Sequence, residues 1–182
     1  MKTKNTFIPF LIMIVVSLAL AASFFLPYAS VTAETRAVIE KYPDEIFFPE
    51  VEMAAKDAAD MSLLNFFNIY SYMAGNNISV DVATTCVVMI SLLALFTVLI
   101  ILFVILKRPV PIIVFTLLGF GVFFLLGTDF QMRKVIGAGK YDFSIAYFIF
   151  LIGFIVIFAC AIWLLVLKIK DKKTAKQISS QN

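Results

Sequence analysis

Acidic side chains gathered in one stretch of the chain could do chemistry, because hard cations bind carboxylate oxygens. They lie between two long apolar runs, at Glu40, Asp44, Glu45, Glu50, Glu52, Asp57 and Asp60. Their spacing does not match the calcium-binding loop of about 12 residues in which Asp, Asn and Gly recur. We therefore interpret them as solvated charges that help to set membrane topology, and we predict no metal site.

Histidine is absent from the 182 residues, which removes the commonest metal ligand and the commonest general base. Both cysteines, Cys86 and Cys160, fall inside apolar runs, so the acidic segment has no thiol for a disulfide. Without histidine, neither a serine protease with its base nor a histidine-ligated metalloprotease can be assembled. We expect no catalytic residue, no cofactor and no enzyme activity.

An apolar stripe after Ser62 points most directly to an interaction. Its residues follow helical i, i+3, i+4 and i+7 spacing, at Leu63, Phe66, Phe67, Tyr70 and Met73. Such a face either docks a partner or ligand, or covers the protein's own helices or the lipid headgroups. We predict one helix over residues 49–74, because Pro49 suits a first helical position and Gly75 suits an end. This helix is the part that we expect to contact a partner.

Four apolar stretches hold the acidic segment and the apolar stripe at a membrane. The composition agrees, since the chain is 62% hydrophobic and only 15% charged. Each stretch approaches or exceeds the roughly 20 helical residues that cross a hydrocarbon core. We predict an all-α integral membrane protein with four transmembrane helices and a helical extracellular loop between the first and second spans. The segments are an N-terminus (1–6), a first span (7–26), an acidic, partly helical outer loop (27–82), a second span (83–106), an inner turn (107–109), a third span (110–127), a short outer loop (128–142), a fourth span (143–167) and a Lys-rich tail (168–182).

Orientation follows from Lys and Arg, which collect in the short segments that stay in the cytoplasm. Lys107 and Arg108 in the inner turn, together with the tail lysines, place both termini inside. The first span could instead be a cleaved signal, but its apolar run is longer than the usual 7 to 15 residues of a signal core, so we favour retention. Compact tails and the absence of cysteine from the outer loop favour a bacterial plasma membrane.

Inside the predicted spans there is no ionisable Asp, Glu, Lys or Arg side chain. Such groups mark proton relays and ion pathways, so a pump or secondary transporter acting alone is disfavoured. Small residues such as Gly119, Gly121 and Gly153 suit close contact between helices.

The order of a long first outer loop and a short second one resembles the claudin-type tetraspan arrangement. The resemblance is one of topology, because the loop contains neither the tryptophan nor the paired cysteines of that family. Tetraspanins keep their large loop between the third and fourth spans. The resemblance therefore implies no residue role and no activity.

These patterns predict a non-catalytic accessory or interaction subunit of a membrane complex. One alternative is a self-associating bundle that forms a pore or binds lipid or a small apolar ligand. Another is an immunity or stress-response membrane protein. The expected partners are membrane lipid and, through docking or self-association, another membrane protein; no nucleic acid is expected.

Overall fold

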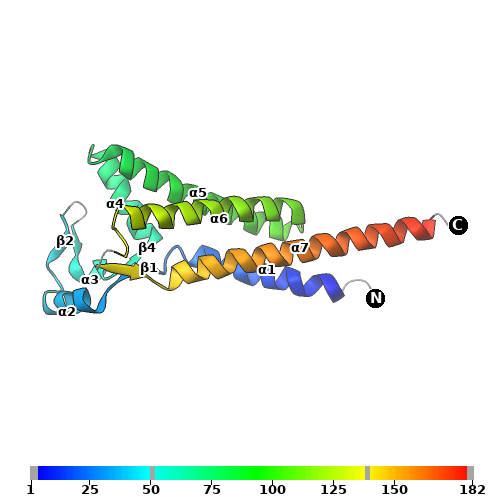
Figure 1. Ribbon diagram of the computed structural model, residues 1–182, viewed down its shortest axis with the longest axis horizontal. Helices are drawn as coiled ribbons and strands as arrows, with labels where there is room; N and C mark the ends of the chain where they lie inside the picture. The colour runs from blue at the N-terminus through cyan, green and yellow to red at the C-terminus, as the bar shows by residue number, and fades with distance from the viewer. Residues whose placement is uncertain (1–3, 50–51, 138–139, 180–182) are drawn as a thin grey trace.

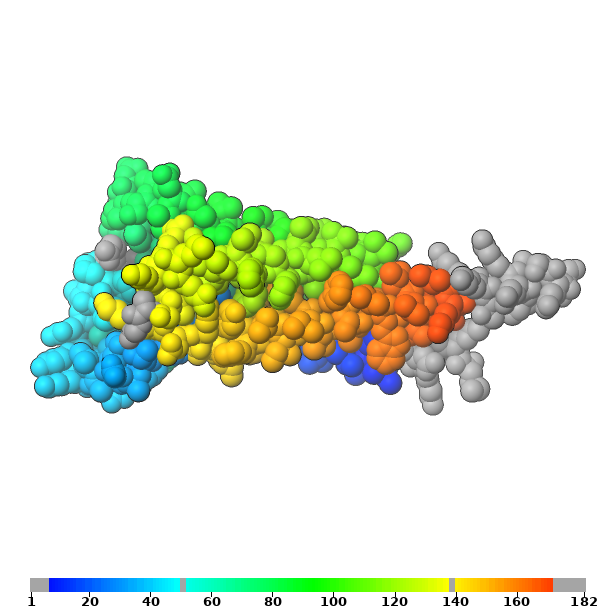
Figure 2. All heavy atoms as spheres, viewed as in Figure 1, coloured from blue at the N-terminus to red at the C-terminus, as the bar shows by residue number. Residues whose placement is uncertain are grey.

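The computed structural model describes residues 4–49, 52–137 and 140–179, most of them helical. Long helices form a bundle, and short strands and helices form a cap at the end away from the C-terminus (Figure 1). The cap comprises the segments between the first and second long helices and between the third and fourth. In the space-filling view the blue and cyan cap residues gather at that end (Figure 2).

Three helices of the described chain are long and apolar enough to cross a membrane. They are α5 (Val80–Ile105), α6 (Pro109–Met132) and α7 (Ile145–Ser179), the last of which is apolar in its first part. A fourth helix, α1 (Lys4–Ala22), contains a shorter apolar stretch, Phe7–Ala22. The chain is therefore a multi-pass membrane protein by the length and composition of its helices.

The long helices pack in two pairs, α1 with α7 and α5 with α6, and α6 joins the pairs by contacting α7. Gly153 brings α1 and α7 close together, because a Cβ at this position would lie 2.6 Å from Leu20 Cδ2. Between α5 and α6 the chain reverses in a short turn, where Lys107 has a positive φ of 53°. Pro109 then occupies the first turn of α6, where its missing amide hydrogen removes no helical hydrogen bond.

A three-stranded antiparallel sheet in the order β4-β1-β5 ties the two loops of the cap together. The central strand, β1 (Pro27–Val31), pairs with β4 (Asp60–Ser62) on one side and β5 (Tyr141–Phe143) on the other. The register places Ser30 opposite both Asp60 and Asp142.

Tyr28 of β1 anchors the sheet to the bundle, because its side chain is fully buried among four aromatic rings. The ring centroids of Phe123, Phe130, Phe143 and Tyr147 lie 5.9 to 6.5 Å away in edge-to-face geometry. The two sides of the bundle and the cap therefore share one core.

The prediction of a single helix over residues 49–74 is wrong. Its first part forms β3 (Met53–Ala54), the short helix α3 (Ala55–Ala58) and β4, and β3 pairs with β2 (Ile46–Phe48). The helix that carries the apolar stripe, α4 (Leu63–Gly75), begins only after Ser62, whose Oγ accepts a hydrogen bond from the Asn65 amide at 3.1 Å. Pairing with β1 satisfies the backbone before Ser62 and outweighs local helical preference.

The cap contains a further helix, and the first long helix ends earlier than its predicted span. The predicted outer loop contains the helix α2 (Ala33–Lys41), and α4 ends at Gly75 as expected. The helix α1, at the predicted first span, ends at Ala22 rather than at residue 26, and a turn over residues 23–26 leads into β1. Residue Glu50 of the acidic set lies outside the described residues.

Candidate ligand-binding site

The five residues of the predicted partner-contact face all lie on α4, but the structure turns most of that face inward. Leu63, Phe66 and Tyr70 are buried, with 0%, 4% and 8% of their surface exposed. Phe67 and Met73 are half-buried. A partner that contacted the whole face would first have to separate α4 from the bundle.

Phe130 of α6 holds the α4 face in place. The Phe66 and Phe130 ring centroids are 4.8 Å apart, and those of Tyr70 and Phe130 are 6.2 Å apart with the rings nearly parallel. Aromatic pairs at these separations contribute about 0.5–1.5 kcal/mol each beyond their buried area. The α4 face is thus part of the structural core, and only its edge is left to bind anything.

That edge forms one wall of a cavity of about 330 Å³, which we call the cap cavity. Phe66, Ile69, Tyr70 and Met73 of α4 contribute this wall. The β2 strand contributes Phe47 and Phe48, whose rings meet edge-on at a centroid distance of 5.1 Å. The remaining wall comes from the segment between α6 and α7, with Lys134, Val135, Lys140 and Tyr141. Segments far apart in sequence therefore build one largely apolar cavity.

Two lysines are the only charged residues that line the cap cavity among those described. Lys134 and Lys140 are both exposed to solvent, so each ammonium group keeps its hydration when the cavity is empty. Lys134 adopts a positive φ of 57° just after α6, which turns the chain toward the cavity wall. An apolar cavity with cationic groups beside it suits an amphiphilic ligand with a negative charge.

Tyr141 fixes the base of the cap beside this cavity. Its hydroxyl donates a hydrogen bond of 2.7 Å to the Ala58 carbonyl oxygen. Burial, and secondarily the nearby Asp60 carboxylate, raises the pKa of Tyr141 to about 12. The phenol therefore stays protonated and keeps donating at any physiological pH.

A small polar cluster lies behind the Tyr70 ring, and the hydropathy pattern gave no sign of it. Arg133 Nη2 and Asp129 Oδ1 form an ion pair of 2.8 Å, with 28% and 19% of the side chains exposed. The Cys86 thiol donates to Asp129 Oδ2 over 3.5 Å and also interacts with the Tyr70 hydroxyl. The sequence placed Asp129 in the short outer loop, because the apolar run stops at residue 127. In the structure α6 continues through Met132 and includes Asp129.

The cluster contains one unsatisfied donor. Among the described residues, Arg133 Nη1 is buried and has no hydrogen-bond partner. Burial is the main cause that raises the pKa of Tyr70, so its hydroxyl is neutral beside this arginine. The cluster adjoins the cap cavity, since Tyr70 belongs to both, but the Arg133 charge is already balanced by Asp129.

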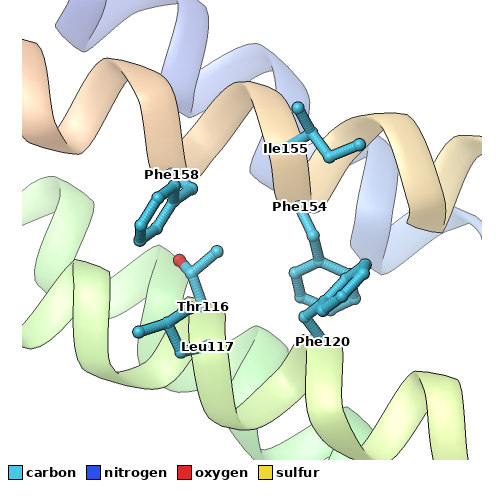
Figure 3. Close-up of a pocket in the computed structure, with 6 residues that line it drawn as sticks. All are labelled: Thr116, Leu117, Phe120, Phe154, Ile155 and Phe158. Atoms are coloured by element: carbon cyan, nitrogen blue, oxygen red, sulfur yellow. The ribbon is translucent and has the colours of Figure 1, made fainter.

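A second hollow lies between α6 and α7 and is open at the surface of the bundle, where Leu117 and Ile155 are exposed. This groove, of about 170 Å³, is lined by Thr116, Leu117, Phe120, Phe154, Ile155 and Phe158. Figure 3 shows Thr116 and Phe120 of α6 opposite Phe154 and Phe158 of α7. The only hydroxyl, on Thr116, donates to the Ile112 carbonyl oxygen at 2.7 Å, so the groove offers only apolar contact.

No group of three or more Cys, Asp and Glu side chains within the described residues is placed to hold a metal ion. Most of the acidic residues of the cap are exposed, and two of them form ion pairs, Asp44 with Lys56 and Asp60 with Arg36. Comparison with known proteins finds no matching family model, no matching curated protein and no matching solved structure.

Proposed function

We propose that this protein is a four-span plasma-membrane protein that binds an anionic amphiphile, such as a fatty acid, in its cap cavity. The cavity is the observation that carries the proposal, because it combines aromatic walls with Lys134 and Lys140. Its volume of about 330 Å³ lies within the range of sites for small molecules, roughly 300–1,000 Å³. The ligand's apolar part would contact the aromatic walls, and its negative group would approach the lysines.

Retention of α1 as a fourth span is supported by its packing. Met13, Ser17 and Leu20 follow one face of α1 and are almost completely buried against the bundle. A signal sequence that is removed from the mature protein is not expected to pack this closely against the other helices. With α1 retained, the start of α1 and the end of α7 lie at the same end of the bundle (Figure 1). The basic residues Lys107, Arg108 and Lys168 at this end favour the cytoplasm.

Photolabelling tests the ligand. The full chain in lipid nanodiscs would be incubated with a medium-chain fatty acid that carries a photoreactive group, with and without the unlabelled acid. We expect saturable labelling of peptides from α4 and β2. Met73→Trp should abolish labelling by filling the cavity, whereas Leu64→Trp, on the exposed face of the same helix, should leave it unchanged.

Charge provides the second arm of this experiment. The double substitution Lys134→Gln and Lys140→Gln should weaken binding at least fivefold, because each cation near an anion contributes roughly 1 kcal/mol. The control is Lys41→Gln, since the Lys41 ammonium lies over the Tyr42 ring, 5.4 Å from its centroid, and does not line the cavity. Equal labelling of all variants would refute ligand binding in this cavity.

An accessory subunit is the second candidate function. Three residues of the predicted contact face, Phe66, Tyr70 and Met73, line the cavity, so an apolar side chain of a partner protein could fill it in place of a free ligand. Affinity purification in mild detergent separates the two functions. A stoichiometric co-eluting protein that is lost in Met73→Trp would favour the subunit, and a co-eluting fatty acid would favour the ligand.

Conduction through a single copy has less support. Tyr28, Phe123, Phe150 and Phe154 fill the described interior of the bundle and make successive ring contacts. Such packing leaves the described core dry, so a pore would have to form between copies.

A further inference from the structure

A third hollow lies at the other end of the bundle, where α6 begins beside α7. Its volume is about 360 Å³, and two of its lining residues, Arg108 and Lys168, are cationic. The rest of the lining is apolar, from Pro109, Val110, Pro111, Leu165 and Ile169. We call it the basal groove. It combines the charge of a phosphate site with the apolar wall of a lipid site.

Neither cation of the basal groove forms an ion pair among the side chains that the structure describes. Lys168 Nζ donates one hydrogen bond to the Lys107 carbonyl oxygen, which leaves two of its three hydrogens for another acceptor. Asp171, one turn further along α7, is exposed and is the nearest acidic residue in the sequence. The groove therefore presents unneutralised positive charge.

Side chains, rather than the start of the helix, must provide this charge. Pro109 and Pro111 both lie in the first turn of α6 and have no amide hydrogen, so this helix end is a poor anion site on its own. Arg108 immediately precedes that turn, and its planar guanidinium matches two oxygens of a phosphate.

The basal groove and the apolar groove of Figure 3 lie along the same helix faces. On α6, Val110 and Leu117 are separated by seven residues, which returns to the same face roughly 10 Å further along the axis. On α7, Leu165 and Phe158 have the same relation. Ile162 lies between these two residues and is exposed, so an apolar surface connects one groove with the other along α7.

From this geometry we propose that an anionic phospholipid of the leaflet at the basal end binds specifically between α6 and α7. Arg108 and Lys168 bind its phosphate, and one acyl chain follows the two helices into the apolar groove. Charged headgroups bind basic hollows between membrane helices in this way. The site is separate from the cap cavity and does not depend on what the cap binds.

Native mass spectrometry of the full chain, released from mild detergent, tests the headgroup. We expect one bound phosphatidylglycerol per chain and at least fivefold lower occupancy by phosphatidylcholine of the same chain length. Arg108→Gln and Lys168→Gln should each reduce phosphatidylglycerol binding about fivefold, which corresponds to roughly 1 kcal/mol per cation.

Lys107→Gln is the matched control for charge. It removes one positive charge from the same turn, but the Lys107 ammonium lies over the Phe10 ring, 4.7 Å from its centroid, and is not part of the groove. Equal losses in Lys107→Gln and Arg108→Gln would overturn the proposal, because they would indicate attraction by net charge alone.

Two further arms test the lipid as the source of the phosphate. Inorganic phosphate in millimolar excess should not displace the lipid; displacement would assign the groove to free phosphate and overturn the proposal. Leu117→Trp, which fills the apolar groove, should reduce binding of long-chain lipid more than of short-chain lipid. Leu118→Trp, similarly exposed but outside the groove, should have no such effect, and equal behaviour of the two variants would refute the acyl-chain placement.

Discussion

Gly153 offers a quantitative test of how α1 packs against α7. An alanine methyl at this position would lie 2.6 Å from Leu20 Cδ2 and 3.2 Å from Leu20 Cγ. Leu20 is fully buried, so relief requires an unfavourable rotamer or a shift of α1. Overpacking of this kind destabilises by about 1–3 kcal/mol, against which alanine regains up to about 1 kcal/mol of helix propensity. We expect Gly153→Ala to lower the free energy of unfolding by about 1–2 kcal/mol.

Unfolding of the purified chain in bicelles, titrated with a denaturing detergent, measures this loss. Gly121→Ala is the control, because a Cβ at Gly121 meets no atom within 4 Å, and it should not destabilise. Leu20→Ala alone should lose about 2–5 kcal/mol by leaving a cavity.

The double variant decides the mechanism. If the methyl of Gly153→Ala collides with Leu20, combining it with Leu20→Ala must cost clearly less than the sum of the two single changes. Strict additivity, or a Gly153→Ala variant as stable as Gly121→Ala, would refute the packing of α1 described above.

Three further predictions concern the cap. Tyr141→Phe should destabilise the cap by about 1–3 kcal/mol, because the buried Ala58 carbonyl loses its donor. In the unchanged protein, the stabilisation by the Tyr141 hydroxyl is complete below about pH 10 and is lost as pH rises through about 12. Unfolding measured as a function of pH would show this loss. For Asp60, burial alone would raise the pKa, but hydrogen bonds from Ser30 and Arg36 and the Arg36 charge hold it below the usual value. The Asp60 carboxylate therefore stabilises the cap above about pH 4, and this stabilisation is lost as pH falls. Proteolysis of the cap should become faster in acid, and Asp60→Asn should remove this dependence on pH. Asn77, at a φ of 59° after α4, should tolerate Gly but lose about 1 kcal/mol as Ala, measured by thermal unfolding.

Local signals in the sequence predicted the features that local physics determines. Apolar runs predicted the three long helices, Gly75 predicted the end of α4, and the apolar stripe that begins after Ser62 coincides with the N-cap of α4. Each of these depends on residues within a few positions of one another, so composition and capping preferences are sufficient to find them.

The cap could not be predicted in the same way, because its strands have two to five residues and those of the three-stranded sheet pair with partners far away in the chain. Residues 53–62 contain good helix formers, and only pairing with β1 draws part of them into a strand. The cap cavity was missed for the same reason. Its Phe47 and Lys140 meet α4 only after the sheet has brought the two loops together.

The central position of β1 also determines the order in which the sheet can form. Ser30 bonds through its hydroxyl to Ser144, 114 positions further along the chain, and β5 lies just before the last long helix. During synthesis β1 therefore emerges with an unpaired edge and keeps it until α7 is ready to insert. A chain truncated before β5 would keep this edge of β1 unpaired, and an unpaired strand edge can pair with another chain, so completion of the sheet protects the protein from aggregation.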